Sequence, residues 1–484
     1  MKRLVYLLAF ATTLITQPTF AAPAKLSRIS VAQREKLANE YYVEDYGAVA
    51  DSKTVNTKMI QAAVDECHAA GGGIVTLRSG IYLSGTIQLK DNVTLQVRRG
   101  AVLRGTTDPM DYYNIDHFVD ATGQSRGECL VGAIDAKNVG IIGNGLIDGE
   151  GEYFKVNLNR ERMKSWGRSQ EDIDKYSSVR PFLVRIVNCD GVYLKEINLK
   201  SPGAWTCHLF ESSNIKVEDI SINAHVNQNN DGIDLDSCSD VLITGCDIDT
   251  GDDAMCIKST SPKPCENVVI KNCRLKSHWG AIKMGTESMG DYRNITISDC
   301  EVYDTNGGGI KILSVDGSNI YNVKIHKINM VNVDLPIFIR LGERCRTYRD
   351  AAKREAGSID ELYISSVTAV TKSLADSKIM PPSGIFVTGT PNARIGRVSL
   401  QYIDITLPGG GKADDARRVV AEDETRYPEF SFFGVLPAYG IYARHIEKLE
   451  VKGVKFHLTG DDVRPIYKYE DVDDTYPEYP LFVK

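Results

Sequence analysis

The chain lacks the features that mark two large classes of protein. Its 57 Lys and Arg against 64 Asp and Glu give a net charge of -7, whereas nucleic-acid-binding proteins usually present a basic surface. It also has no apolar run close to the roughly 20 residues that cross a bilayer as a helix. We therefore expect no nucleic-acid partner and no membrane span. The 42% hydrophobic and 25% charged residues suit a globular protein with a large core.

The first residues have the pattern of a processing signal. The basic start Met1-Lys2-Arg3 precedes a nearly uninterrupted apolar run over residues 4–15, and Thr19-Phe20-Ala21 offers a small-x-Ala cleavage site. The run is too short for a membrane anchor, and no Cys follows it to carry a lipid. We expect residues 1–21 to be a secretory signal peptide. Residues 22–484 are then exported, either secreted or periplasmic.

A repeat without any helical period runs through the chain. Four apolar positions, spaced two, three and two residues apart, recur every 23 to 28 residues. The alternation predicts short strands with one inward face, and the three-residue gap predicts a bend. Such a unit cannot bury its inner face alone, so the copies must stack. The repeat predicts an all-β fold, a parallel β-helix. Its clear copies begin at Val192, Ile215, Val241, Val268, Ile295 and Val323, with weaker ones at Leu362, Val398 and Leu449.

The alternative repeat architecture is a leucine-rich horseshoe. It needs a recurrent Leu framework, whereas Val and Ile dominate here and suit stacked strands. We expect one solenoid domain over residues 22–484, with a helix over residues 54–70 covering its N-terminal end. Ile60, Ala63 and Val64 share a face of that helix with Cys67.

The eleven cysteines are an odd number, so at least one thiol stays unpaired within the chain. Cys246, Cys273 and Cys300 occupy the third apolar position of successive copies, which predicts an inward ladder of buried thiols. A metal site is the less favoured interpretation, because no His shares the column. Disulfides among Cys238, Cys256 and Cys265 are compatible with an oxidising compartment, but sequence does not set their pairing.

Acidic residues gather where the copies align. Asp231 and Asp252 are 21 residues apart, close to one turn of the solenoid, and Asp234 and Asp253 join them. Like charges on neighbouring strands are destabilising, so the cluster indicates catalysis or binding. Two chemistries fit these residue types: a Ca²⁺ site, which takes carboxylate oxygens, and glycoside hydrolysis by paired carboxylates.

Two lysines share a column beside these acids. Aligning the apolar frames places Asp234, Cys256, Lys283 and Lys311 on successive rungs. Adjacent lysines repel one another unless an anion neutralises them, so the column indicates a site for the carboxylate of an acidic sugar. The alternative is a pair of solvated surface lysines.

At these residues the sequence resembles the polygalacturonase-type glycoside hydrolases of family 28. The motifs are Asn229-Asn230-Asp231, Asp252-Asp253 and the segment from Ser201 to His208, and the resemblance spans residues 43–345. It implies a right-handed parallel β-helix that acts as a monomer on pectic polysaccharide or oligogalacturonide, without a metal or other cofactor. By position it implies that Asp252 is the general acid, that Asp231 and Asp253 activate water for one inverting displacement, and that Asn229 contacts substrate. Inverting enzymes place acid and base roughly 6.5–9.5 Å apart.

The sequence departs from the family pattern at two positions. The family His falls on Gly280, with His278 two residues away, and the family Arg falls on Gly309, which leaves Lys311 of that motif. Lys283 would restore the missing positive charge. These departures favour an exo-acting enzyme for α-linked galacturonic acid, or one for rhamnose-containing pectin. The basic stretch from Arg340 to Arg346 either lines a further subsite or is an exposed loop.

Two other functions remain open at this stage. A pectate lyase on the same fold needs calcium and makes unsaturated products. A non-catalytic carbohydrate-binding β-helix binds galacturonides without turnover, although the Asp252-Asp253 pair argues against it.

Overall fold

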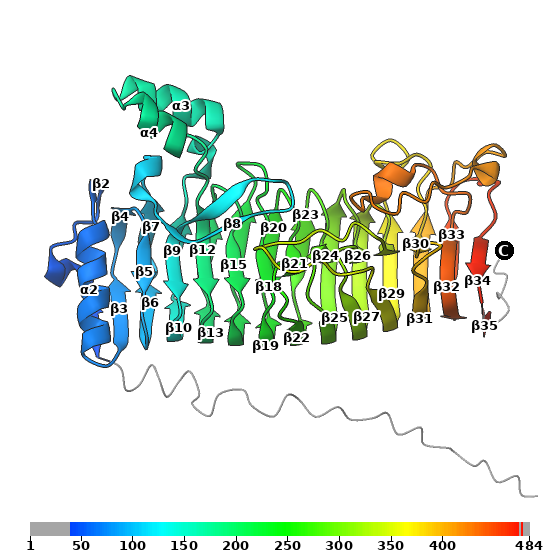
Figure 1. Ribbon diagram of the computed structural model, residues 1–484, viewed down its shortest axis with the longest axis horizontal. Helices are drawn as coiled ribbons and strands as arrows, with labels where there is room; N and C mark the ends of the chain where they lie inside the picture. The colour runs from blue at the N-terminus through cyan, green and yellow to red at the C-terminus, as the bar shows by residue number, and fades with distance from the viewer. Residues whose placement is uncertain (1–38, 474–475, 478–484) are drawn as a thin grey trace, which may run out of the picture.

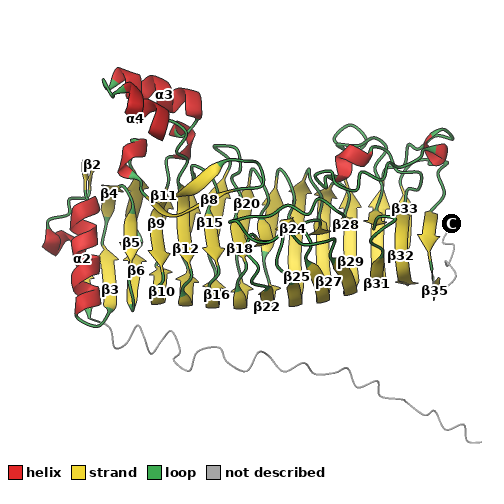
Figure 2. Ribbon diagram, viewed as in Figure 1, coloured by secondary structure: helices red, strands yellow, loops and turns green. Residues whose placement is uncertain are grey.

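The computed structural model describes residues 39–473 and 476–477, and the predicted signal peptide lies outside them. The strands wind into a parallel β-helix (Figure 1). Helices lie at its N-terminal end and along one edge of the strand stack (Figure 2). None of the helices in residues 39–473 has the length and apolar content that a bilayer crossing needs.

Each turn of the solenoid contributes to three parallel sheets. The first sheet, which carries the acids and lysines, contains β5 (Ile87–Leu89), β9 (Ser125–Ile134), β12 (Phe182–Val187), β15 (Cys207–Phe210), β18 (Ile233–Asp236), β21 (Met255–Ser259), β24 (Ile282–Ser288), β26 (Ile310–Ser314), β28 (Ile337–Leu341), β30 (Ile385–Thr388), β32 (Ile441–Lys452) and β34 (Tyr467–Val472). A strand outside the solenoid wall, β8 (Asn114–Val119), pairs antiparallel with β9.

The second sheet follows the first around each turn. It contains β1 (Glu40–Tyr42), β3 (Gly73–Leu77), β6 (Val93–Val97), β10 (Lys137–Ile142), β13 (Asp190–Lys195), β16 (Ser213–Glu218), β19 (Ser239–Thr244), β22 (Cys265–Lys271), β25 (Tyr292–Thr305), β27 (Asn319–Val333), β29 (Ser358–Thr371), β31 (Ile395–Leu407), the end of β32, and β35 (Tyr476–Pro477).

The third sheet closes the turn. It contains β2 (Asp51–Val55), β4 (Gly80–Ser84), β7 (Ala101–Gly105), β11 (Leu146–Asp148), β14 (Asn198–Lys200), β17 (Ser221–Ala224), β20 (Asp247–Thr250), β23 (Arg274–Ser277), the second halves of β25, β27, β29 and β31, and β33 (Lys455–Leu458).

The predicted bend is present, and it has a specific backbone conformation. The residue just before the third apolar position has a positive φ in every copy of the repeat. Asp, Asn and Gly tolerate this left-handed region best, and several copies use them. The bend turns the chain from the second sheet into the third. Its residues are Glu196, Asp219, Gly245, Asn272, Asp299, Lys327, Ser366, Tyr402 and Gly453.

A ladder of amide side chains, which the sequence reading missed, joins neighbouring turns. Asn267 donates to Asp240 over 3.1 Å, Asn294 to Asn267 over 3.2 Å, and Asn322 to Asn294 over 2.9 Å. Each of these residues directly precedes the first apolar position of its copy and has a positive φ. These four positions recur every 27 or 28 residues, and this period would have revealed the ladder in the sequence.

The helix at the N-terminal end, α2 (Thr57–Ala69), buries Ile60, Ala63, Val64 and Cys67 as predicted. It begins three residues later than expected because Thr54 belongs to β2. Asn56 precedes the helix, and its amide nitrogen donates to the carbonyls of Val49 and Thr54.

The thiol ladder is confirmed, and no disulfide forms. Cys246, Cys273 and Cys300 are each at most 2% exposed. All eleven cysteines lie in the described residues and are free. The suggested pairing among Cys238, Cys256 and Cys265 is therefore not observed. Cys256 points outward in the column of Lys283, and its Sγ donates to the Gly285 carbonyl.

Insertions project from one edge of the solenoid. Near the N-terminal end, α3 (Val156–Ser165) and α4 (Gln170–Tyr176) rise above this edge, and a short orange helix, η5 (Phe430–Phe433), lies above the same edge nearer the C-terminus (Figure 1). The remaining short 3-10 helices are η1 (Val43–Tyr46), η2 (Pro109–Asp111), η3 (Gly151–Tyr153) and η4 (Asp415–Arg417).

Candidate active site

The register of the first sheet confirms the predicted column. Asp234 of β18 pairs with Cys256 of β21, Cys256 with Lys283 of β24, and Lys283 with Lys311 of β26. Because side chains alternate along a strand, this register aims the four side chains to the same face of the sheet. Inward-facing neighbours such as Ile233 and Ile282 fill the core.

Asp231 and Asp253 lie on neighbouring turns, just before β18 and β21. The backbone N–H of Gly232 donates to the Asp253 carbonyl over 2.9 Å, which fixes the two turns against each other. One carboxylate oxygen of Asp231, one of Asp253 and the Sγ of Cys256 all lie within 4.8 Å of one another. Two buried carboxylates therefore face the same small space.

Asp253 is held as a carboxylate. Its Oδ2 accepts from Lys283 Nζ over 2.6 Å, and its Oδ1 accepts from the Gly280 backbone N–H over 3.1 Å. Burial by itself would raise the pKa of Asp253, but the positive charges of Lys283 and Lys311 outweigh burial and lower it. Lys283 is thus committed to a partner within the chain.

Asp231 and Asp234 share a buried counter-ion that the sequence reading missed. Lys258 Nζ lies 3.4 Å from Asp231 Oδ2, 3.3 Å from Asp234 Oδ1 and 3.7 Å from Glu287 Oε2. It also lies 3.9 Å from the ring centroid of Trp205, in cation–π contact. Lys258 points outward two residues beyond Cys256, so the strand alternation that located Lys283 would also have located it.

The two acids next to Lys258 are poorly solvated. Burial raises the pKa of Asp234 to about 7, although Lys258 opposes the shift. Burial also raises the pKa of Asp231, and the charges of Asp252, Asp234 and Asp253 add to the rise. Oδ1 of Asp231 and both oxygens of Asp234 are buried without a hydrogen-bond donor. Asp231 Oδ1 is therefore free to bind a polar group of a ligand.

Asp252 lies at the opening of this cluster. It is partly exposed and lines a cleft of about 1470 Å³ with Asn229, Arg180, His225 and His278. Burial, together with the charge of Asp253, raises the pKa of Asp252 to about 6. The adjacent acids Asp252 and Asp253 therefore have pKa shifts in opposite directions, an arrangement that separates an acid from a base.

Asn229 is fixed by two arginines that the sequence reading did not single out. Its Oδ1 accepts from Arg126 and from Arg180, each over 3.2 Å, and its φ is 53°. Arg126 is paired with Asp120 over 2.9 Å. Arg126 of β9 lies 103 positions before Asn229 and Arg180, in the loop before β12, lies 49 positions before it, so no local motif connects the three residues. Asn229 thereby contributes to the wall of the cleft.

His278 lines the cleft together with Asp252. It is exposed, and its ring centroid is 4.7 Å from that of His225. His225 Nε2 in turn lies 2.6 Å from Asp249 Oδ1. Burial lowers the pKa of His278, and the neighbouring His225 lowers it further. The two imidazoles form part of the cleft wall next to Asp252.

Lys311 also has a partner within the chain, from an insertion far along the sequence. Its Nζ lies 2.9 Å from Glu429 Oε2, and both side chains are 1% exposed. The predicted column is present, but Lys283 and Lys311 are both buried and neutralised by acids. They are not solvated surface lysines.

Arg340 does not join this cluster, contrary to its predicted contact with substrate. It is buried, and its guanidinium donates to the carbonyls of Gly389, Glu422 and Asp423. Sequence alone could not show that the insertion over residues 408–440 covers this strand end. Arg344 is likewise used internally, on both oxygens of Asp316.

A Ca²⁺ ion does not suit this cluster. Asp231, Asp253 and Cys256 are close enough together to hold a metal, but calcium takes oxygen ligands. Burial raises the pKa of the Cys256 thiol well above its usual value, which disfavours the thiolate that softer metals need. Asp253 is already hydrogen-bonded to Lys283. The residues fit acid–base chemistry better than cation binding.

Comparison with known proteins identifies the family. Residues 76–385 match the description Glycosyl hydrolases family 28. The chain belongs to glycosyl hydrolase family 28. It is 28% identical over 283 residues to a probable polygalacturonase of Vitis vinifera, covering 54% of this chain and 55% of that protein. It is 25% identical over 287 residues to an exo-poly-alpha-D-galacturonosidase of Dickeya chrysanthemi, covering 51% of this chain and 47% of that protein.

The match therefore spans about half the length of these two relatives. Among solved structures, a family 28 exopolygalacturonase of Yersinia enterocolitica superposes with a TM-score of 0.69 at 20% identity, covering 90% of this chain and 78% of that one. This superposition confirms the β-helix.

The structure explains why this family 28 protein has no His at position 280. A Cβ placed on Gly280 would lie 2.8 Å from Asp253 Oδ1 and 3.0 Å from Lys311 Cδ. The aliphatic part of Lys311 therefore fills the space that a side chain at position 280 would need. The Gly280 N–H instead donates to Asp253.

Restoring the family residue is therefore expected to harm the enzyme. In Gly280→His the new ring must displace Lys311 and shift Asp253, and misplacing a reacting group by about 1 Å costs on the order of 10²-fold in rate. We expect kcat/KM to fall by about that factor, with a smaller loss in Gly280→Ala. Thermal denaturation of both variants checks that they fold. Wild-type kcat/KM in a folded Gly280→His protein would contradict this account.

Proposed function

We propose that this family 28 protein hydrolyses bonds of α-linked galacturonic acid in pectic saccharides by one inverting displacement. The observation that carries the proposal is the opposite pKa shift of two adjacent carboxyl groups. The pKa of Asp252 is raised to about 6, whereas that of Asp253 is lowered. Such a pair supplies a proton donor and a proton acceptor at the same pH.

In the proposed reaction, Asp252 gives its proton to the glycosidic oxygen as the bond to the anomeric carbon breaks. A water molecule between Asp231 and Asp253 attacks the anomeric carbon from the other side and loses a proton to Asp253. The product sugar has the inverted anomeric configuration. The distance of at most 4.8 Å between oxygens of Asp231 and Asp253 allows one water to contact both.

We further propose that the enzyme acts on chain ends. A polymer can pass through a groove only if both ends of the groove are open. Here the segment between η3 and α3, α3 itself and the segment after α4 line one side of the cleft, and the insertion over residues 408–440 rises above the same edge nearer the C-terminus (Figure 1). Product profiling on polygalacturonate tests this. A single small product from the start of the reaction supports exo action, whereas early oligomers of many lengths contradict it.

The calcium-dependent lyase is tested in the same assay. We expect activity to be unchanged after exhaustive dialysis against a chelator, because Asp231 and Asp253 are paired with lysines and need no metal ion to balance their charge. We also expect reducing ends without unsaturated products. Loss of activity on chelation, restored by added Ca²⁺, would show that the lyase mechanism is the correct one.

We also propose that residues 22–484 act as one exported domain after removal of residues 1–21. The basic start, short apolar run and Thr19-Phe20-Ala21 site support this proposal. N-terminal sequencing of the exported protein should begin at Ala22. Retention of the full-length chain inside the cell would contradict export.

A further inference from the structure

We propose that Glu429 makes the subsite beside Lys311 specific for a sugar unit without a free carboxylate. The proposal rests on the proposed hydrolysis of pectic saccharides and adds a preference at one subsite. Glu429 Oε2 lies 2.9 Å from Lys311 Nζ, and the two side chains are 1% exposed. The Lys311 ammonium, which the sequence predicted to bind the carboxylate of an acidic sugar, is therefore already paired with a carboxylate of the protein itself.

Lys311 lies next to the reacting groups. A Cβ placed on Gly280 would lie 3.0 Å from Lys311 Cδ and 2.8 Å from Asp253 Oδ1, so the side chains of Lys311 and Asp253 are neighbours. Its Nζ is 5.8 Å from the ring centroid of Trp279, which is partly exposed. A sugar bound beside Asp253 in this direction would pack on an aromatic ring and face a neutral Lys–Glu pair. Such a surface suits a deoxy sugar or an esterified uronate.

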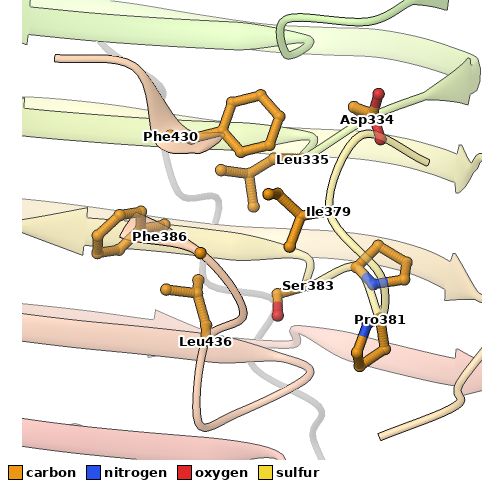
Figure 3. Close-up of a pocket in the computed structure, with 10 residues that line it drawn as sticks. Asp334, Leu335, Ile379, Pro381, Ser383, Phe386, Phe430 and Leu436 are labelled. Carbon is orange, nitrogen blue, oxygen red and sulfur yellow. The ribbon is translucent and has the colours of Figure 1, made fainter. Parts of the chain in front are cut away.

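Glu429 is held in place by the packing of its segment. The adjacent Phe430 packs with Leu335, Phe386 and Leu436 around a small apolar crevice (Figure 3). Its backbone N–H donates to Glu429 Oε1 over 3.2 Å. Arg464 donates to the Leu436 carbonyl over 3.1 Å. The segment is therefore a fixed part of the wall.

A substrate carboxylate would have to compete with this carboxylate. If it replaced Glu429 on Lys311, Glu429 would stay buried without its hydrogen-bonded lysine, which is strongly unfavourable. Lys283 is no substitute, because it is hydrogen-bonded to Asp253 over 2.6 Å. Lys378 also faces this region, with its Nζ 3.4 Å from the Trp279 centroid, but it is exposed and its charge is screened by solvent.

Charge-paired variants test the proposal. The measured quantity is the ratio of kcat/KM for a galacturonate–rhamnose–galacturonate trisaccharide to kcat/KM for trigalacturonate. In Glu429→Gln the unpaired Lys311 should attract the uronate, so we expect the ratio to fall about tenfold or more, as for a gained charge-assisted hydrogen bond. In Lys311→Met the unpaired Glu429 should repel it, so the ratio should rise. In the double variant, which is neutral like the pair, the ratio should return close to the wild-type value.

The double variant keeps the test decisive if either single variant fails to fold. A ratio that rises equally in Lys311→Met and in the double variant would show that Lys311 binds the substrate carboxylate, and the proposal would be wrong. Glu447→Gln is the matched control, because Glu447 is exposed on β32. If wild-type protein cleaves neither trisaccharide, the proposed function itself fails. If it cleaves them and no variant changes the ratio, only the role of Glu429 is refuted.

Discussion

We expect the replacement of Asp252 by Asn to lower kcat/KM on oligogalacturonides by about 10²–10⁴-fold, the usual contribution of a general acid, which is the role proposed for it. The amide has the same shape as the carboxyl group. Its oxygen still accepts the hydrogen bond from the Asp253 N–H, which lies 3.0 Å from Asp252 Oδ1 in the native protein. It has no proton to give to the glycosidic oxygen. Substrate binding should change much less than kcat, because the proton is transferred only in the transition state.

The control for this variant is Asp247→Asn, which alters an exposed carboxylate of β20 that pairs with Arg274. Its kcat/KM should match that of the wild type. Steady-state kinetics and thermal denaturation of both variants check the result. Full activity in folded Asp252→Asn protein would remove Asp252 from the mechanism and with it the proposed division into acid and base.

The pH dependence of the wild type follows from the same two groups. Asp252 must be protonated, and its pKa is raised to about 6, so kcat/KM should fall as the pH rises above this value. Asp253 must be ionised, and its pKa is lowered, so the loss on the acid side should occur below the usual range of an aspartate. A bell-shaped profile with its maximum in mildly acidic solution is expected. Activity that rises steadily from pH 5 to 8 would contradict these roles.

Much of the site's placement was predictable because strand geometry is periodic. Once the frames were aligned, a period of two residues placed Asp234, Cys256, Lys283 and Lys311 on one face, and the observed register agrees. The same period, followed two residues further along β21, leads to Lys258 on that face. The bend residues and the amide ladder also follow the repeat, so they were accessible from the sequence.

What could not be predicted depends on the insertions. Lys311 meets Glu429, 118 residues further along the chain, and Asn229 meets Arg126, 103 residues before it. No repeat or motif connects such positions, because each insertion packs according to its own side chains. The prediction that Arg340 contacts substrate failed for this reason. Its donors are taken by backbone carbonyls of the insertion over residues 408–440.

The second large effect is expected on stability, from the buried counter-ion Lys258. In Lys258→Met, the acids Asp231, Asp234 and Glu287 lose a lysine that lies within 3.4, 3.3 and 3.7 Å of them. Removing one partner of a buried ion pair costs about 3–5 kcal/mol. We expect a loss of this size in the free energy of unfolding at pH 7.5, measured with urea.

The loss should shrink in acid, and the sign follows from the pKa shifts. Burial raises the folded-state pKa of Asp231 and that of Asp234, the latter to about 7. The folded protein then binds more protons than the unfolded chain between about pH 4 and 7, so its stability falls as the pH rises through this interval. Lys258 opposes both shifts, so its removal raises both pKa values further and extends the fall to higher pH. Lys258→Met should therefore approach wild-type stability near pH 4.5 and differ most above pH 7.

The control is Lys263→Met, since Lys263 is largely exposed and pairs with Glu211. An equal loss at both pH values would mean that Lys258 acts through packing on Trp205, not through charge.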